Sequence, residues 1–400
     1  MLLSPLALVL TASPLSFDDA LRLASEAPVV AGGREAVTAR KRLGATVSGL
    51  TANPQVGVQA GWRKHEKDQG PELFGSIAQP LNLAGYGGAR RAALSRELEH
   101  EESLGKTVLL GVRLRVARSW LSAWAAQTSL HEAKRELDLA TDWSARVERA
   151  AVAGGLTKAD AAAARGWKAE AALAALAAEG EVFSAGVMLN AALGVDATEP
   201  SQAAEALPEL PLPQPAELSQ SLERAEHAPG VAQWANARDA EEAHLVEVRA
   251  ANSTWLQVGV HAGREGSGDL IGLGTLQLTL PMFDQGERDQ ARYKALAARA
   301  EGDRRDALAR ARAERVDIIH ELEHTREVLD MVEGDLLPAA EDAARFAQKR
   351  MEGGEGNAFE WVMARRTVLM AKGRRLRAQA DHTMSRFAAA ELAAATGETP

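Results

Sequence analysis

Residues 55–61 read QVGVQAG, and residues 257–263 read QVGVHAG, with one substitution between them. The likeness extends further, since Pro80 recurs as Pro281 and the residues before the motif recur as a group: Ala27, Pro28, Val30 and Ala31 correspond to Ala228, Pro229, Val231 and Ala232. A repeat at a nearly constant offset indicates that one structural unit occurs twice, which is more informative about the fold than any single motif. The sequence therefore predicts two copies of one unit, each containing a helix, a strand pair and a long helical hairpin.

The strand pairs are predicted from alternation of apolar with polar or small residues. In the first copy Val56, Val58, Ala60 and Trp62 alternate with Gln55, Gly57, Gln59, Gly61 and Arg63. Such a period of two places the apolar side chains on one face of a strand and the polar ones on the other. We therefore expect strands at about residues 55–64, 73–83, 255–264 and 270–280.

Long helices are predicted after each strand pair, at about residues 90–153 and 287–351. At 1.5 Å per residue each would be roughly 95 Å long and would need partner helices to be stable. Return helices are expected at about residues 157–193 and 358–395, after the glycine pairs Gly154-Gly155 and Gly353-Gly354. Glycine readily adopts the left-handed conformation that ends a helix. The predicted repeats are residues 16–199 and 216–396, joined by a proline-rich linker at residues 200–215.

Composition narrows the class of protein. Aromatic residues make up 4% of the chain against 46% hydrophobic residues in total, a balance that suits close helix packing. The chain has no cysteine, which excludes disulfides and thiolate metal sites. A net charge of -9, with both signs interspersed, argues against a nucleic-acid partner.

The N-terminus is expected to be an export signal over residues 1–15, with an apolar core from Leu2 to Leu10 and small residues near Ala12, although no Lys or Arg precedes that core. No later stretch approaches 18 uninterrupted apolar residues, so a membrane-spanning part is expected to consist of strands. Strands of about ten residues cross a bilayer at the usual tilt. Four strands cannot close a barrel alone, since the smallest membrane barrels need about eight, so we expect an oligomer.

The order of these elements resembles the TolC-type outer membrane efflux proteins. The resemblance is carried by Asn53-Pro54 before the first strand, by Pro281-Met282-Phe283-Asp284 with Gly286 and Arg288 after the last, and by the glycine tips. It covers nearly the whole chain and implies a mainly α fold with a small β part. Three protomers, each giving four strands, would form a 12-stranded β-barrel in the bacterial outer membrane and an α-helical barrel in the periplasm.

The resemblance also implies a function. Such a homotrimer is a passive conduit that exports small solutes, drugs or metal ions, together with a periplasmic adaptor protein and an inner-membrane transporter. It uses no cofactor and catalyses nothing. Val56, Val58, Ala60 and Trp62 would face lipid, Gln55, Gln59 and Arg63 would line the lumen, and Pro80 and Pro281 would mark where strand becomes helix.

The periplasmic entrance is expected at the two glycine tips, and its candidate gate residues are Gly154, Gly155, Asp160, Glu352, Gly353, Gly354, Glu355 and Glu360. Three-fold symmetry would turn an inward-facing carboxylate into a ring that favours cations. Exposed acidic residues at such tips are, alternatively, only solvated.

Two other functions compete with the channel. His320-Glu321-Leu322-Glu323-His324 fits H-E-x-x-H, in which two histidines bind zinc and the glutamate activates water in a protease. No recognisable third ligand follows, so a polar stripe on a helix or a transient metal contact are the alternatives at this motif. A soluble periplasmic coiled-coil scaffold is the other competing function. Trp120, Trp124 and Trp143 are expected to be core residues.

Overall fold

The computed structural model describes residues 14–46, 52–64, 69–211, 220 and 223–395. Most of the predicted signal, residues 1–15, and the end of the predicted linker, residues 200–215, lie outside the described residues. The chain divides into two compact units. The first, called here the helical unit, comprises Met1–Ala31, Thr107–Ala228 and Arg310–Pro400; the second, the sheet unit, comprises Gly32–Lys106 and Pro229–Ala309.

The element order confirms the predicted duplication. After α1 (Phe17–Ala24), the first copy contains α2 (Pro28–Thr46), β1 (Gln55–Lys64), β2 (Gln69–Asn82), α3 (Tyr86–Val152) and α4 (Lys158–Leu193). After the short helix η2 (Ala225–His227), the second copy contains α6 (Pro229–Ala251), β3 (Trp255–Arg264), β4 (Leu270–Thr279), α7 (Glu287–Met331), the π-helical turn η3 (Val332–Leu336), α8 (Leu337–Glu352) and α9 (Ala358–Ala395). The predicted fold class, long helical hairpins with a four-stranded sheet, is therefore confirmed.

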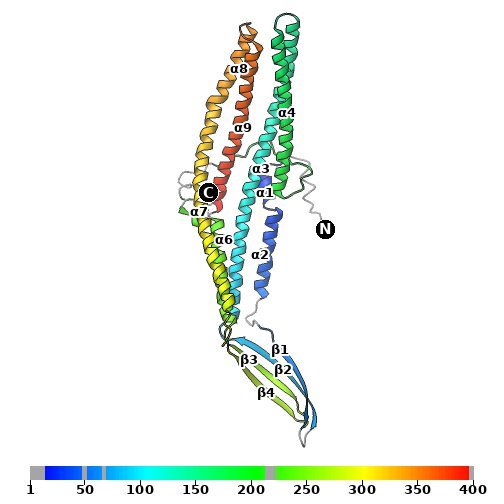
Figure 1. Cartoon of the computed structure of the whole chain (residues 1–400), viewed down its shortest axis with the longest axis vertical. Coiled ribbons are helices and arrows are strands. Elements are labelled where there is room, and N and C mark those ends of the chain that lie inside the picture. The colour runs from blue at the N-terminus through cyan, green and yellow to red at the C-terminus, as the bar shows by residue number, and fades with distance from the viewer. Residues whose placement is uncertain (1–13, 47–51, 65–68, 212–219, 221–222, 396–400) are drawn as a thin grey trace. The chain divides into compact units, whose positions relative to one another are not determined.

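The sheet is antiparallel with strand order β1-β2-β3-β4, so the hairpins of the two copies lie side by side (Figure 1). Val58 lies opposite Gly75 in the β1–β2 pair, and Ile77 lies opposite Val260 in the β2–β3 pair. Because side chains alternate along each strand, this register puts residues of one parity from every strand on the same face. The apolar alternation seen in one strand is thereby extended across all four.

Pro80 lies close to the connection from β2 to α3. Pro80 was predicted to lie where strand becomes helix, within a strand expected to end near residue 83; β2 ends at Asn82, two residues after Pro80, which lies opposite Gln257 of β3. Pairing with β1 ends at Ala78, so Pro80 has a neighbouring strand on one side only, where a missing N–H is tolerated. The strand ends where the Asn82 side chain accepts hydrogen bonds from the N–H groups of Ala84 and Tyr86, at 2.9 and 3.0 Å.

In the sheet unit, polar contacts link the helices. Arg40 of α2 pairs with Glu97 of α3 and lies 3.3 Å from Glu101. His244 of α6 contacts Glu97 at 2.7 Å and Glu247 at 3.0 Å. The hydrogen bond to Glu247, with further support from Glu97, raises the pKa of His244 against the opposing effect of burial. An imidazole between two carboxylates thus ties α6 to α3.

The second long helix differs from its prediction. A continuous helix was expected over residues 287–351, but α7 gives way to η3, and α8 then carries Pro338 in its first turn. Proline lacks an N–H group, and its ring clashes with the carbonyl four residues earlier, so an α-helix cannot pass through it undisturbed. The wider π-helical turn just before Pro338 absorbs this disturbance. The first long helix, α3, is continuous.

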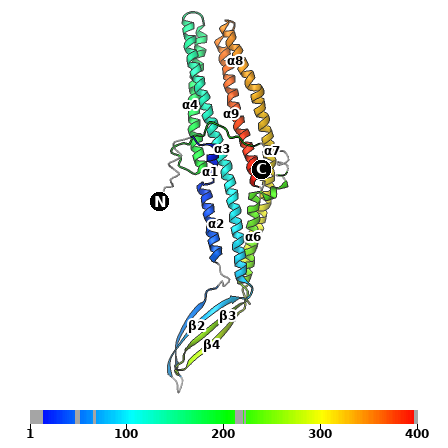
Figure 2. The ribbon, with the colours of Figure 1, turned by 180° about the vertical axis from the view of Figure 1, so that it is seen from behind.

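The core of the helical unit is built around aromatic residues. Phe17 of α1 contacts Trp120 of α3 and Phe387 of α9, with ring centroids 5.2 and 5.3 Å apart. The indole N–H of Trp120 donates to the carbonyl of Leu15 at 2.7 Å, which satisfies its only polar atom. Trp120, Trp124 and Trp143 are all buried, as predicted. Figure 2 shows the two helical hairpins of this unit, α3 with α4 and α8 with α9.

Candidate functional site

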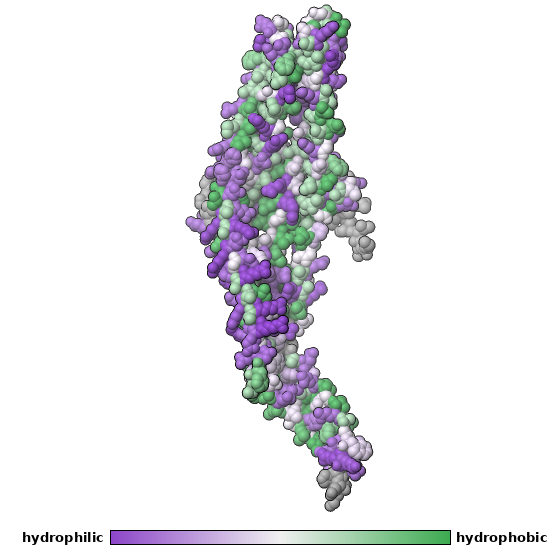
Figure 3. All heavy atoms as spheres, in the orientation of Figure 1, coloured by the Kyte–Doolittle hydropathy of each residue, from purple (hydrophilic) through white to green (hydrophobic). Residues whose placement is uncertain are grey.

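The sheet carries an apolar face that no described residue covers. The register aligns Val56, Val58 and Trp62 of β1 with residues of the same face on the other strands, and hydrophobic residues are visible over the sheet in Figure 3. Val58 is 73% exposed and Trp62 is 69% exposed. The other large exposed apolar side chains of this face are Leu73, Ile77, Val258, Val260, Leu270, Leu276 and Leu278.

An apolar surface that extends over four strands is far more than scattered single residues, and it indicates contact with lipid or another apolar partner. Ala60 lies on the same face opposite Leu73 and is exposed as well. The predicted set of Val56, Val58, Ala60 and Trp62 therefore lies together on the apolar face, and contact with lipid remains a prediction.

The opposite face is mainly polar or small-chained. Gln55 accepts a hydrogen bond from the side-chain amide of Gln257 at 2.8 Å, and Gln59 lies on the same face. Arg63 forms a two-point contact with Glu265, at 3.1 and 3.2 Å, and also pairs with Glu72. The three side chains predicted to line a lumen thus share one face, and two of them, Gln55 and Arg63, bind side chains from other parts of the sheet.

The two outer strands have unsatisfied edges. β1 pairs only with β2, and β4 pairs only with β3, among the described strands. The outward N–H and C=O groups of both strands therefore need partners, and in hydrocarbon each unpaired group would cost several kcal/mol. Both edges of the sheet therefore lack hydrogen-bond partners among the described residues.

The first helical tip joins α3 to α4. Gly154 has a positive φ of 78°, a conformation that favours glycine, and Gly155 follows it in the turn. Thr157 and Asp160 then form a capping box: the Thr157 hydroxyl accepts from the Asp160 N–H, and the Asp160 carboxylate accepts from the Thr157 N–H. The hydroxyl of Thr157 is the main cause that lowers the pKa of Asp160.

The second tip joins α8 to α9 in a similar way. Gly354 has a positive φ of 75°, whereas Gly353 stays in the helical region. Glu352 accepts a hydrogen bond from Gln348 at 2.9 Å. Arg350 lies 3.4 Å from Glu360 and donates to the backbone carbonyl of Glu355 at 3.2 Å.

Asp160 connects the two tips. Its second carboxylate oxygen, Oδ1, accepts a hydrogen bond from the Ala358 N–H at the start of α9, with a distance of 3.1 Å. One side chain therefore caps its own helix and also holds the neighbouring hairpin. The sequence singled out Asp160 as a gate candidate, but this bond between hairpins could be found only once their packing was known.

Sequence reasoning missed a tryptophan cluster below the tips. Trp143 of α3, Trp167 of α4 and Trp361 of α9 contact one another, with ring centroids between 4.4 and 5.4 Å apart. Two ion pairs lie on the same helices: Arg365 pairs with the buried Glu136, and Lys372 lies 2.6 Å from Glu132. These contacts fasten α9 to α3.

The H-E-x-x-H motif lies on α7, in the helical unit. His320 and His324 are exposed, and their rings stack with centroids 5.8 Å apart. Within the described residues no group of three or more His, Cys, Asp or Glu side chains is placed to hold a metal ion. The third protein ligand that a zinc protease requires is therefore not supplied by this part of the chain.

One described helix, α4 (Lys158–Leu193), is long and apolar enough to cross a membrane by length and composition, contrary to the expectation of none. The physical reason is its alanine content, which raises hydropathy without a continuous run of large side chains. Ala161, Ala164 and Trp167 of this helix are buried in the cluster that α4 shares with α3 and α9. That packing accounts for the apolar composition of this part of α4.

No family model matches the chain, and neither does any curated protein. Among solved structures, the outer membrane protein VceC from Vibrio cholerae is 16% identical and has a TM-score of 0.67, with 95% of this chain and 96% of that chain covered. The CmeC outer membrane channel of Campylobacter jejuni is 14% identical, with coverage of 95% and 86% and a TM-score of 0.70. The open state of the MtrE outer membrane channel of Neisseria gonorrhoeae is 15% identical, with coverage of 95% and 88% and a TM-score of 0.68. The chain has the fold of these proteins along almost its whole length.

Proposed function

We propose that this chain is one protomer of a trimeric outer membrane channel in a tripartite efflux system, through which small solutes such as drugs or metal ions leave the periplasm. The observation that carries the proposal is the four-stranded sheet with an exposed apolar face and two unpaired edges. Lipid would cover the apolar face, and strands from sister subunits would pair with the edges.

The dimensions of the sheet support insertion in a bilayer. β1, β3 and β4 each contain 10 residues, which matches the length of about 9–11 residues that crosses the hydrocarbon core at the usual tilt. Closing the sheet removes every free edge. Three copies would supply twelve strands, above the minimum of about eight for a membrane barrel. The resemblance to the TolC-type proteins implies the same stoichiometry, and the outer membrane channels that share this fold support a location in the outer membrane.

On this proposal the polar face of the sheet lines the aqueous path, with Gln55, Gln59 and Arg63 among its residues. The helical hairpins continue the path into the periplasm, and the tips at Gly154 and Gly354 form its entrance. A periplasmic adaptor protein would contact these tips, and the adaptor would connect them to an inner-membrane transporter. The transporter, rather than this chain, would then select the solute, and the channel would have no catalytic step.

The tip contacts supply a candidate gate. Asp160 links the two hairpins through the Ala358 N–H at 3.1 Å, and Arg350 lies 3.4 Å from Glu360 beside it. Ala358 is buried in the same cluster as Trp143, Trp167 and Trp361, so the Asp160 contact lies directly beside that aromatic layer. The proposed gate therefore consists of these polar contacts at the tips, next to the aromatic layer.

Two measurements test the proposal. Full-length protein reconstituted in a planar bilayer is expected to give discrete conductance steps. Protein in washed outer membranes is expected to stay with the membrane in high salt and at alkaline pH, and to leave only with detergent. Release without detergent, with no conductance, would favour the soluble scaffold. Loss of a proteolytic activity in Glu321→Gln would favour the protease.

A further inference from the structure

The pair His320 and His324 on α7 has no role in the proposed channel. Both side chains are exposed, and their rings lie nearly parallel, with an interplanar angle of 15° and centroids 5.8 Å apart. Residues four apart on a helix are neighbours on one face, so the two rings point the same way. The pair thus presents two imidazoles next to each other on one helical turn.

The ring nitrogens of this pair are free to bind a ligand. Neither imidazole forms a hydrogen bond or ion pair within the described residues. Imidazole nitrogens bind Zn²⁺ at about 2.0–2.1 Å, and histidines at i and i+4 on one helical face are a known arrangement for one shared cation. Rotation of the two exposed side chains would bring one nitrogen of each ring to that distance from a shared ion.

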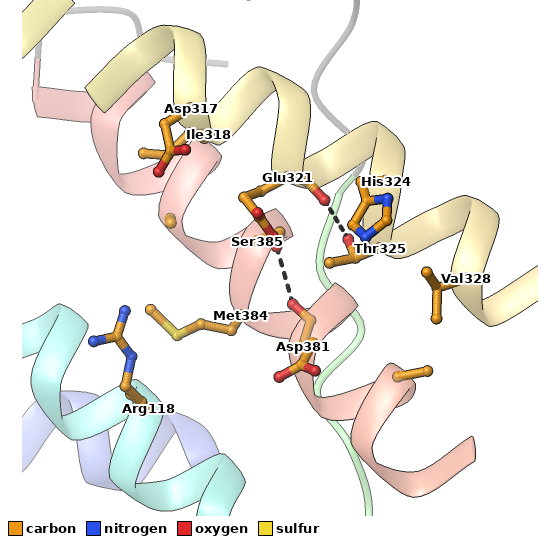
Figure 4. A pocket seen from close by; sticks show the side chains of 12 residues that line it. Arg118, Asp317, Ile318, Glu321, His324, Thr325, Val328, Asp381, Met384 and Ser385 are labelled. Atoms are coloured by element: carbon orange, nitrogen blue, oxygen red, sulfur yellow. Dashed lines mark hydrogen bonds between the residues drawn. The ribbon is translucent and has the colours of Figure 1, made fainter. Parts of the chain in front are cut away.

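The surroundings are acidic. His324 lines a cavity of about 560 Å³ between α7, α9 and α3, together with Asp317, Glu321 and Asp381 (Figure 4). The guanidinium of Arg118 lines the same cavity and opposes these three carboxylates. The net negative charge attracts a cation, and carboxylates near a metal accept hydrogen bonds from metal-bound water or orient the histidine ligands.

We propose that His320 and His324 together bind one divalent transition-metal ion, with Cu²⁺ bound most tightly. Imidazole ligands favour Cu²⁺, Ni²⁺ and Zn²⁺ over Mg²⁺ and Ca²⁺, and among the former the affinity for Cu²⁺ is highest. Since no described group supplies three protein ligands, water completes the coordination. The site is therefore open and exchangeable, unlike a structural zinc site. This inference concerns binding alone and does not depend on the proposed channel.

The test uses the purified full-length protein in detergent, prepared without a polyhistidine tag and titrated with Cu²⁺ in a non-coordinating buffer. Wild-type protein is expected to bind one Cu²⁺ per chain, with nitrogen splitting in the electron paramagnetic resonance spectrum. His320→Ala and His324→Ala are each expected to weaken binding at least tenfold, and excess Ca²⁺ is expected not to compete. His131→Ala removes another exposed helical histidine and is expected to leave binding unchanged.

A spacing control separates paired from independent histidines. The double variant His324→Ala with Arg326→His keeps two histidines but places them six residues apart, on different sides of α7, so it is expected to bind no better than His324→Ala alone. Circular dichroism would establish that each variant keeps its helices. The proposal is overturned if wild-type protein binds no Cu²⁺, if either single variant stays within twofold of wild type, or if the spacing control retains wild-type affinity.

Discussion

A charge on the apolar face of β1 should prevent insertion, whereas the same charge one residue later should not. Val58 is 73% exposed and lies in the middle of β1, opposite Gly75, while Gln59 points to the other face. A lysine at the bilayer midplane of a membrane barrel costs about 2–4 kcal/mol. Since each of three subunits would carry the substitution, Val58→Lys should destabilise the inserted trimer by roughly 6–12 kcal/mol.

The matched variant Gln59→Lys should change stability by less than about 1 kcal/mol, because its ammonium group would remain in water on the polar face. Folding into lipid vesicles, followed by urea titration, measures both variants. The loss for Val58→Lys corresponds to about 30- to 700-fold in the folding equilibrium of each chain. Equal losses for the two variants, or a larger loss for Gln59→Lys, would refute the assignment of faces.

Three further predictions concern the helices. Trp361→Ala should destabilise the helical unit by about 3–5 kcal/mol, because it empties the centre of the tryptophan cluster. The control Phe359→Ala removes a side chain that is 62% exposed and should have little effect. Thermal unfolding followed by circular dichroism measures both variants. Asp160→Asn weakens the acceptor of the Ala358 N–H, so hydrogen exchange at that amide should become faster and channel conductance should increase. An unchanged exchange rate would contradict the proposed link between the tips. His244→Gln removes a group whose pKa is raised in the folded protein. The variant's decrease in melting temperature should therefore be largest below about pH 6.5 and should become smaller as the pH rises through the raised pKa. A decrease that grows with pH would contradict the ion pair.

The repeat and the alternation in the strands predicted the duplicated unit of helix, strand pair and long helical hairpin, and the resemblance to the TolC-type proteins supplied the rest of the predicted fold. QVGVQAG and QVGVHAG placed β1 and β3 within their observed bounds, because apolar residues at every second position report a two-faced strand directly. The helical periodicity of the sequence was less informative about whether a long helix is continuous. Pro338 interrupts the second long helix, although the polar and apolar pattern continues across it, and the π-helical turn before it is a local adjustment that the pattern does not report.

The candidate site was only partly predictable for a related reason. The tip glycines and the capping residue Asp160 are local signals, readable from a few neighbouring residues. The Asp160–Ala358 bond and the contacts among Trp143, Trp167 and Trp361 join separate hairpins, so they depend on how far one hairpin is shifted along the other. Helical periodicity identifies the buried side of each helix but does not fix that shift.

The most direct test of the central claim is a cross-link between the edge strands of different subunits. The chain has no cysteine, so pairs introduced in β1 and β4, beginning with Val58→Cys and Leu276→Cys and stepping along β4, can be oxidised in intact outer membranes. β2 and β3 separate these strands within one chain by three spacings of about 4.8 Å, which is beyond the reach of a disulfide of about 7 Å. The proposed barrel predicts covalent dimers and trimers for at least one pair. A chain that stays monomeric for every pair, with its sheet folded in the membrane, would contradict it.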